Sequence, residues 1–301
     1  MEKNNFFSNV ININNKVVNK ERPGGKKYEN HKTSGARVIA ITSGKGGVGK
    51  TNIVANLGFV LSRLGKKVLL LDADLGLGNI DVLLGLAPKY NLSHVIMGEK
   101  KISDIIVNGP GDMMILPASS GVNCLTNITD GQRADMLSQL DVLIDRVDIL
   151  LIDTAAGISS NVIFFNVSAQ EIIVIVSPEP TSITDAYALM KILSLQHSEK
   201  NFKLIVNSAR TVNEADDVYK QLNLVADRFL DITIEYLGYV LYDEKLVKSV
   251  KRQKIVSEIF PDTISTSCFD TIAKQICELS PLYPAGEDSG LFWRNLFPKK
   301  V

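Results

Sequence analysis

The ten residues SGKGGVGKTN, from Ser43 to Asn52, stand between a short apolar run and a segment of helical length and periodicity. Their spacing matches the G-x-x-x-x-G-K-[ST] pattern of a phosphate-binding loop, in the strand, loop and helix order that this pattern requires. Glycines let backbone N–H groups close around phosphate oxygens, and the following helix adds the positive end of its dipole. We therefore predict a nucleotide site formed by Gly44, Lys45, Gly46, Gly47, Val48, Gly49, Lys50, Thr51 and Asn52.

Two residues at the end of this loop indicate the ligands. Lys50 is expected to neutralise the β- and γ-phosphates, and the hydroxyl of Thr51 is expected to bind Mg²⁺ directly. ATP and Mg²⁺ are therefore the predicted cofactors.

The rest of the chain repeats the alternation of strand and helix. Apolar runs cover residues 37–42, 67–72, 148–153, 171–176, 202–207 and 236–241. Because these runs lack polar alternation, we expect strands buried on both faces, as in a parallel sheet covered by helices. The pattern predicts a doubly wound, mostly parallel α/β domain over residues 37–280, with ligands bound at the carboxyl ends of its strands.

Three polar residues at strand ends are candidates for the same site. Asp153 ends an apolar strand in the Walker B manner and would support Mg²⁺ through its water shell, while Gly157 would let the following segment move. Asp72 ends another strand, and a carboxylate in the next turn, Asp74, can orient an attacking water. Asn207 can present both a donor and an acceptor to an adenine edge. Helix capping or a simple turn is the competing interpretation of such residues.

Composition excludes several classes of protein. Lys plus Arg and Asp plus Glu both number 33, so no global charge indicates a nucleic-acid partner. The three cysteines form no CxxC pair and predict reduced thiols in a cytoplasmic protein. No run approaches the roughly 18 apolar residues of a membrane span, and the start of the chain lacks the apolar core of a secretory signal.

The two ends of the chain differ from the domain between them. Residues 1–36 hold seven Lys or Arg against three Glu and predict a mobile tail. Residues 281–290 are a breaker-rich linker. The segment 291–301 would form an amphipathic helix that targets an anionic membrane surface through the apolar stripe Phe292, Trp293, Leu296 and Phe297. Packing of this helix on its own domain is the alternative.

The stretch KGGVGKT resembles the deviant phosphate loop of the MinD/ParA class of P-loop ATPases. In that class the earlier lysine, here Lys45, reaches the phosphates of a neighbouring subunit, and two subunits enclose two ATP molecules. The resemblance implies a homodimer that ATP favours and hydrolysis releases. It also assigns Asp74 to the attacking water with Asp72 behind it, and Asn207 to the adenine.

Three longer stretches, DADLGLGNIDVLLGL, SPEPTSITDAYALMK and LGYVLYDEKLVKSV, are similar to the FlhG (FleN) family of flagellar number and placement regulators. This resemblance implies slow ATP hydrolysis and attachment to the inner face of the cell membrane when ATP is bound. The implied partners are the GTPase FlhF, the flagellar switch-ring proteins and an enhancer-binding transcription activator. Three features depart from the family: Ala155 and Gly78 replace a usual glycine and alanine, and residues 1–36 show no Asp-Gln-Ala motif.

Two other functions fit parts of the sequence. A DNA-partition ATPase of the ParA type would use the basic run 245–254 on DNA phosphates, with a steep salt dependence. A solvated helix face explains this run as well, and we expect no DNA partner. A nucleotide-gated scaffold or transcription antagonist would need little hydrolysis.

Overall fold

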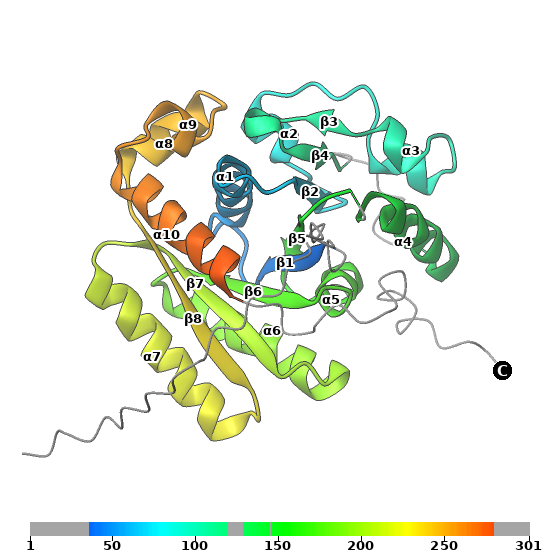
Figure 1. Ribbon diagram of the computed structural model, residues 1–301. Helices are drawn as coiled ribbons and strands as arrows, with labels where there is room; N and C mark the ends of the chain where they lie inside the picture. The colour runs from blue at the N-terminus through cyan, green and yellow to red at the C-terminus, as the bar shows by residue number, and fades with distance from the viewer. Residues whose placement is uncertain (1–35, 119–128, 145, 280–301) are drawn as a thin grey trace, which may run out of the picture. The chain divides into compact units, whose positions relative to one another are not determined.

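Parallel strands form the centre of the protein, as the apolar runs predict. The computed structural model describes residues 36–118, 129–144 and 146–279. Within them lies one eight-stranded sheet of order β3-β4-β2-β5-β1-β6-β7-β8, in which only the β3–β4 pair is antiparallel (Figure 1). The strands are β1 (Arg37–Ser43), β2 (Val68–Ala73), β3 (Val107–Asn108), β4 (Met114–Leu116), β5 (Ile149–Ala156), β6 (Glu171–Val176), β7 (Asn201–Ala209) and β8 (Thr233–Leu241).

Helices cover both faces of this sheet, so the predicted doubly wound α/β fold is confirmed. They are α1 (Lys50–Arg63), α2 (Ile80–Leu84), α3 (Leu92–Ile96), α4 (Asp130–Ile144), α5 (Ser160–Val167), α6 (Pro180–His197), α7 (Val212–Phe229), α8 (Glu244–Lys251), α9 (Val256–Ile259) and α10 (Ile264–Glu278). Two short 3₁₀ turns, η1 (Ile102–Asp104) and η2 (Pro110–Asp112), precede β3 and β4.

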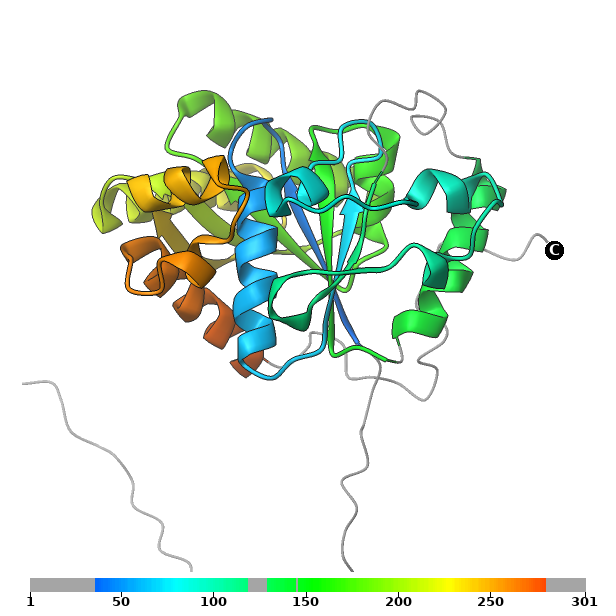
Figure 2. The ribbon, with the colours of Figure 1, turned by 90° about the horizontal axis from the view of Figure 1, so that it is seen from above.

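The two faces have separate cores because alternate residues of each strand point in opposite directions. In β1, Ile39 and Ile41 pack into the cluster that contains α1 and α10, which lie side by side in Figures 1 and 2. Val38 and Ala40 point to the other face, into a cluster with residues of α4 and α5. The burial of both residue sets explains why the strands read as continuous apolar runs.

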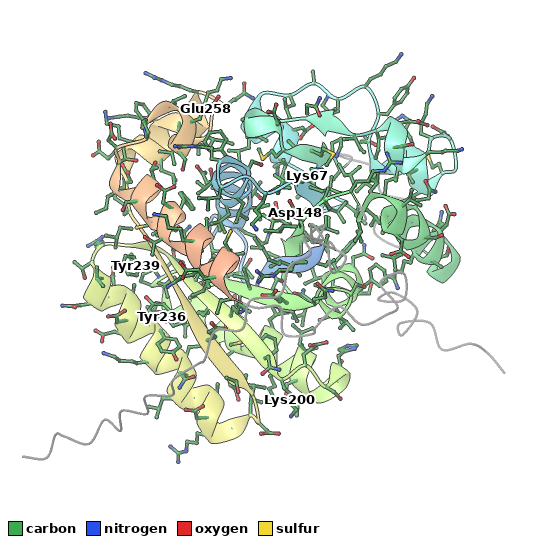
Figure 3. All side chains as sticks on the ribbon, in the orientation of Figure 1. Lys67, Asp148, Lys200, Tyr236, Tyr239 and Glu258 are labelled. Carbon is green, nitrogen blue, oxygen red and sulfur yellow. The ribbon has the colours of Figure 1, made fainter. Side chains whose placement is uncertain are left out.

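The edge strand β8 is covered in the same way on both sides. It packs against α10 on one face and α7 on the other. On the α7 side, Tyr236 stacks on Tyr219, with ring centroids 4.6 Å apart (Figure 3). Both faces of this edge strand are therefore covered by helices.

The amino-terminal ends of four strands are joined by charged side chains. Arg37 at the start of β1 donates two hydrogen bonds, of 2.8 and 2.9 Å, to Glu171 at the start of β6. Lys203 of β7 lies 3.5 Å from the same carboxylate and 2.8 Å from Glu235 of β8. These pairs fix the end of the sheet opposite to the phosphate loop.

Several predicted features lie outside the described residues: the N-terminal tail before Ala36, the linker 281–290, and the amphipathic segment 291–301 with its stripe Phe292, Trp293, Leu296 and Phe297. Ala36 itself is buried and belongs to the core. None of the helices in the described part of the chain is long and apolar enough to span a bilayer.

Candidate nucleotide site

The glycine-rich loop joins β1 to α1, where the sequence predicts it. Gly47 and Gly49 have positive φ angles of 82° and 88°, which side chains rarely adopt. At Gly44 a Cβ atom would lie 2.1 Å from the carbonyl oxygen of Asp185 on α6, so the loop rests directly on the backbone of that helix. Gly46 has no neighbour within 3.9 Å of such an atom and is exposed. The loop is thus fixed at its base and open at its tip.

Lys50 and Asp153 face each other at the bottom of the site. Lys50 Nζ lies 3.2 Å from Asp153 Oδ1, and both side chains are nearly fully buried. The hydroxyl of Thr51 is close enough to lower the pKa of Asp153. The phosphate-loop lysine at the start of α1 therefore contacts the Walker B aspartate near the end of β5, as the two sequence patterns predict.

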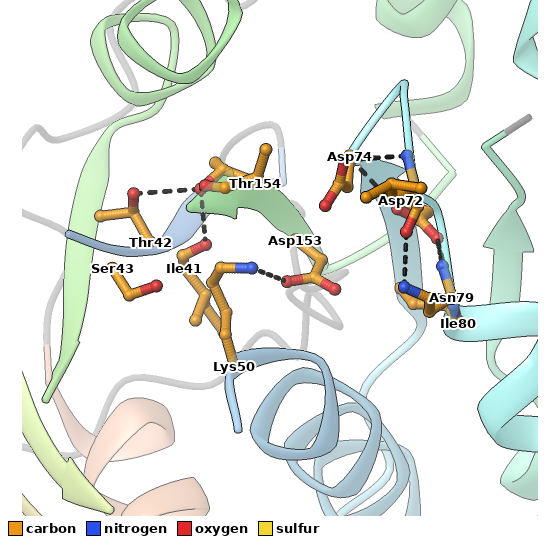
Figure 4. A network of polar contacts seen from close by, with 12 residues as sticks. Ile41, Thr42, Ser43, Lys50, Asp72, Asp74, Asn79, Ile80, Asp153 and Thr154 are labelled. Carbon is orange, nitrogen blue, oxygen red and sulfur yellow. Dashed lines mark hydrogen bonds and ion pairs between the residues drawn. The ribbon is translucent and has the colours of Figure 1, made fainter. Parts of the chain in front are cut away.

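A second carboxylate lies beside this pair on the neighbouring strand. Asp72 of β2 is the register partner of Asp153 and is buried. Its carboxylate accepts backbone N–H bonds from Asp74 (3.2 Å), Asn79 (3.0 Å) and Ile80 (3.1 Å). Figure 4 shows Asp153 between Lys50 and the two aspartates of this loop. Asp72 thus organises the whole turn that follows β2.

The turn from residue 74 to 79 holds the predicted water-orienting residue. Asp74 is partly exposed, and its Oδ1 accepts the backbone N–H of Leu77 at 3.1 Å. Gly78 is confined, since a Cβ there would lie 2.4 Å from Ala118 Cβ and 2.9 Å from Asp72 Oδ2. The alanine that is usual in the FlhG family would need a different conformation of this turn.

The buried acids carry unusual proton affinities. Burial and the charge of Asp153 together raise the pKa of Asp72 to about 8, against the backbone N–H groups that lower it. Burial also raises the pKa of Asp153, although Lys50 opposes the shift. Crowded, desolvated carboxylates with a single buried cation beside them would be stabilised by a divalent metal ion.

Mg²⁺ fits this donor set. Among the described residues there is no cluster of three or more His, Cys, Asp or Glu side chains able to enclose a metal ion. Mg²⁺ in nucleotide sites keeps several waters and takes only one or two protein ligands besides the phosphates. Thr51 beside Asp153 matches that requirement.

Lys45 does not join the other site residues in this structure. Its ammonium group forms an ion pair with Glu179 at the start of α6 and a 2.8 Å hydrogen bond with Thr181 Oγ1. The sequence analysis missed both contacts, although the two residues lie in the stretch SPEPTSITDAYALMK. Nothing in their spacing pairs them with a lysine 134 and 136 positions earlier.

Asn207 stands at the carboxyl end of β7, close to the loop. Its Nδ2 donates a 2.6 Å hydrogen bond to the carbonyl of Val48, and the residue is buried. A Cβ at Gly49 would lie 2.4 Å from the same nitrogen. Asn207 therefore supports the loop backbone, a role that the sequence analysis missed, and its predicted contact with adenine stays a prediction.

The segment after Asp153 is tied to the base of the loop. Gly157 has a φ of 90°, and its N–H donates to the carbonyl of Ser43 at 2.9 Å. Ala155, where the FlhG family has a glycine, packs beside the apolar cluster that holds α6 and α7. The switch segment, residues 157–159 between β5 and α5, is thus tied to the loop at its start.

Comparison with known proteins identifies the class. Residues 36–206, more than half of the chain, match the family model described as an AAA domain. A chain of the MinC:MinD cell division protein complex of Aquifex aeolicus superposes with a TM-score of 0.66 at 29% identity, covering 83% of this chain and all of that one. The chain therefore belongs to this family and is a P-loop ATPase of the MinD/ParA class.

Within the class, the chain is similar to flagellar regulators. It is 44% identical over 240 residues to the antiactivator FleN of Pseudomonas aeruginosa, covering 80% of this chain and 86% of that protein. It is 33% identical over 268 residues to the flagellum site-determining protein YlxH of Helicobacter pylori, covering 89% and 87%. The resemblance to the FlhG (FleN) family is confirmed.

Proposed function

We propose that this chain regulates the number or placement of bacterial flagella as an ATP-dependent homodimer. The observation that carries the proposal is the similarity to FleN and YlxH over more than four-fifths of each of those proteins. Both carry a flagellar or antiactivator role in their names. The phosphate loop with its second lysine, Lys45, supports the nucleotide-dependent part.

ATP is bound by the loop, with Lys50 against its β- and γ-phosphates. Thr51 binds Mg²⁺ through its hydroxyl, and Asp153 supports the ion through a water molecule. When bound, Mg²⁺ neutralises phosphate charge and polarises the bond that is cleaved. The buried pair of Lys50 and Asp153 supports this assignment, because it places the lysine ammonium group and the carboxylate 3.2 Å apart at the base of the phosphate loop.

Hydrolysis depends on the turn after β2. Asp74 orients the attacking water, and Asp72 fixes the turn through its three backbone contacts. A carboxylate in this position raises the rate by holding the nucleophile in line with the γ-phosphate.

Dimerisation uses the face around the loop. Lys45 crosses to the phosphates of the second subunit, so the charge of each nucleotide is neutralised only when two subunits meet. Two large apolar side chains on neighbouring turns, Leu77 and Ile158, are 69% and 53% exposed. In the proposed dimer the second subunit would cover these two side chains.

Membrane attachment and partner binding complete the proposal. The stripe Phe292, Trp293, Leu296 and Phe297 binds an anionic bilayer weakly, and two stripes on one dimer bind it together. The proposed partners are FlhF, the flagellar switch-ring proteins and an enhancer-binding transcription activator.

Truncation after Gly290 tests the membrane attachment. It is expected to abolish ATP-dependent liposome binding and to leave ATP-driven dimerisation intact. Equal liposome binding of the full-length protein with ADP and with ATP would contradict gating by the dimer.

The basic run 245–254 does not favour DNA as a partner. Lys245 and Arg252 lie over the ring of Phe260, at 5.0 and 5.8 Å from its centroid. Lys248 pairs with Glu244 one helical turn away at 3.4 Å. These cations are used within the fold, as on a solvated helix face.

Flagellar counts test the proposal directly. A deletion strain is expected to show an altered number or position of flagella, restored by the wild-type gene and not by Lys45→Ala. The control is Lys251→Ala, which removes an exposed lysine from α8 and should restore the wild-type number and position of flagella. In vitro, light scattering should show an ATP-dependent dimer for the wild type and for Lys251→Ala, but not for Lys45→Ala. Normal flagella in the deletion strain would refute the proposal.

A further inference from the structure

The pairing of strands β1 and β5 is irregular just before the phosphate loop. Their pairing is regular as far as Ile41 and Asp153 and then shifts by one residue. Thr42 is therefore opposite two residues of β5, the first of which is Thr154. Such a bulge interrupts the hydrogen-bond ladder and changes the direction of the side chains around it. Here it falls directly beside Asp153.

Three buried polar side chains bridge the interruption. The hydroxyl oxygens of Thr42 and Thr154 lie 3.0 Å apart, and Thr154 also reaches the carbonyl of Ile41 at 3.2 Å (Figure 4). Asn166 of α5 donates one Nδ2 hydrogen to Thr42 Oγ1 at 3.2 Å and the other to the carbonyl of Val162 at 2.7 Å. Thr42, Thr154 and Asn166 all have no solvent exposure.

The donors of this network converge on Thr42. A threonine hydroxyl has one hydrogen to donate and can accept from others. Asn166 and Thr154 both donate to Thr42 Oγ1, and the hydroxyl of Thr154 also lies within reach of the carbonyls of Ile41 and Ala155, at 3.2 and 2.9 Å. The hydroxyl oxygen of Thr42 is thus the acceptor that links α5 to both strands. A buried acceptor shared by two donors holds both of them in one geometry.

Packing of the core alone does not explain an asparagine at position 166. Its Oδ1 is buried and has no hydrogen-bond partner in the part of the chain that the structure describes. An unpaired buried oxygen lowers stability, and an apolar side chain of similar volume would avoid this. What the amide supplies at this position is its pair of N–H donors.

We propose that Asn166 is a positioning residue of the nucleotide site. Through Thr42 and Thr154 it holds the bulge that directs the carboxylate of Asp153, and it anchors α5 at the far end of the switch segment. The bond from the Gly157 N–H to the Ser43 carbonyl, 2.9 Å long, holds the near end. The inference rests on the proposed function, in which Asp153 supports Mg²⁺ beside the nucleotide.

We expect removal of the Asn166 donors to weaken the effect of Mg²⁺ on ADP binding. Asn166→Leu keeps the volume and removes the donors, so Asp153 loses its fixed direction while Lys50 and the loop glycines stay in place. Binding of ADP without metal should therefore change less than twofold. The tightening of ADP binding by Mg²⁺ should fall about tenfold, the lower end of what loss of a residue behind a metal ligand costs. Thr42→Val should weaken the Mg²⁺ effect on ADP binding to the same extent, and Thr42→Ser should leave it unchanged.

The measurement uses the full-length protein and a fluorescent ADP analogue, titrated in Mg²⁺ and in EDTA. Amide hydrogen exchange around Gly157 provides a second readout without catalysis, and should speed up in Asn166→Leu. The matched control is Ser168→Ala at the end of the same helix. Ser168 is fully buried, and its hydroxyl has no partner among the described residues. Its removal should leave both readouts unchanged.

The outcomes separate the inference from the proposed function. If Asp153→Asn keeps the full Mg²⁺ effect, the role proposed for Asp153 is wrong. If Asp153→Asn loses the effect while folded Asn166→Leu and Thr42→Val keep it, only the positioning role is wrong. If Asn166→Leu does not fold, the comparison of Thr42→Val with Thr42→Ser tests the proposal. An equal effect of Mg²⁺ on ADP binding in the two variants would overturn it. Loss of the Mg²⁺ effect in Thr42→Val but not in Thr42→Ser would support it.

Discussion

Lys45 is held by Glu179 within its own chain, although its predicted target is the nucleotide of another subunit. The ammonium group contacts the carboxylate of Glu179 and the hydroxyl of Thr181, both at the start of α6. The side chains of the pair are 33% and 62% exposed, and exposed ion pairs contribute little to stability. The lysine can therefore exchange this partner for the concentrated charge of phosphates when a second subunit arrives.

Removal of the carboxylate should favour the dimer. Glu179→Gln leaves Lys45 without an intramolecular ion pair to break, so the protein concentration for half-maximal ATP-dependent dimerisation should fall by roughly four- to twenty-fivefold, the factor that corresponds to two surface pairs, one in each subunit, of about 0.4–1 kcal/mol each. Light scattering over a protein titration measures this. Asp217→Asn, which removes an exposed acid paired with Lys220 on α7, is the control. A weaker dimer in Glu179→Gln would mean that Glu179 helps the contact.

Hydrolysis should be separable from binding at Asp74. Asp74→Ala removes the carboxylate that orients water but leaves Lys50, Thr51 and the loop backbone in place. ATP binding and dimerisation should persist, and phosphate release should nearly cease. Asp81→Ala, on the neighbouring helix α2, should hydrolyse normally. Wild-type turnover in Asp74→Ala would remove Asp74 from the mechanism and favour a scaffold that needs binding alone.

Two glycines of the loop should respond differently to the same change. Gly44→Ala places a methyl group 2.1 Å from the backbone of Asp185 on α6, which cannot move aside as a side chain can. Overpacking of this kind costs about 1–3 kcal/mol, or roughly 2–4 °C in Tm per kcal/mol for a domain of this size. Gly46→Ala meets nothing closer than 3.9 Å and should keep its Tm. Equal melting of the two variants would contradict this packing.

Much of the fold and part of the site could be predicted because they depend on local patterns. Continuous apolar runs indicate buried parallel strands, and residues such as Asp72 and Asp153 at their carboxyl ends are brought to one edge by topology alone. The contacts of Lys45 with Glu179, of Asn207 with Val48 and of Asn166 with Thr42 could not be predicted this way. They join residues more than a hundred positions apart through single polar atoms, which leave no periodic pattern in the sequence.

The short elements between α1 and α4 were missed for a related reason. Helices α2 and α3 have five residues each, and β3 and β4 have two and three. Segments of this length carry too few residues for a helical or strand periodicity to be distinguished. Their conformation depends on the sheet edge and on packing against α1 and α4.

The stability of the nucleotide-free protein should depend on pH through Asp72. Burial raises the pKa of Asp72 from 3.8 to about 8. Between these two values the folded state holds a proton that the unfolded state releases, so the contribution of Asp72 to stability is largest below the lower value and falls as pH rises towards 8. Tm measured in EDTA from pH 5 to 9 should therefore decline in the wild type.

Asp72→Asn should flatten this decline, because an amide does not titrate. The variant also places an amide NH2 group against at least one of the three backbone N–H donors, so its absolute Tm is expected to be lower. The slope of Tm against pH, rather than its value at one pH, is thus the quantity to compare. Asp231→Asn, which alters an acid that is 99% exposed, should keep the wild-type slope. Parallel curves for wild type and Asp72→Asn would show that Asp72 is ionised in the folded protein throughout this range.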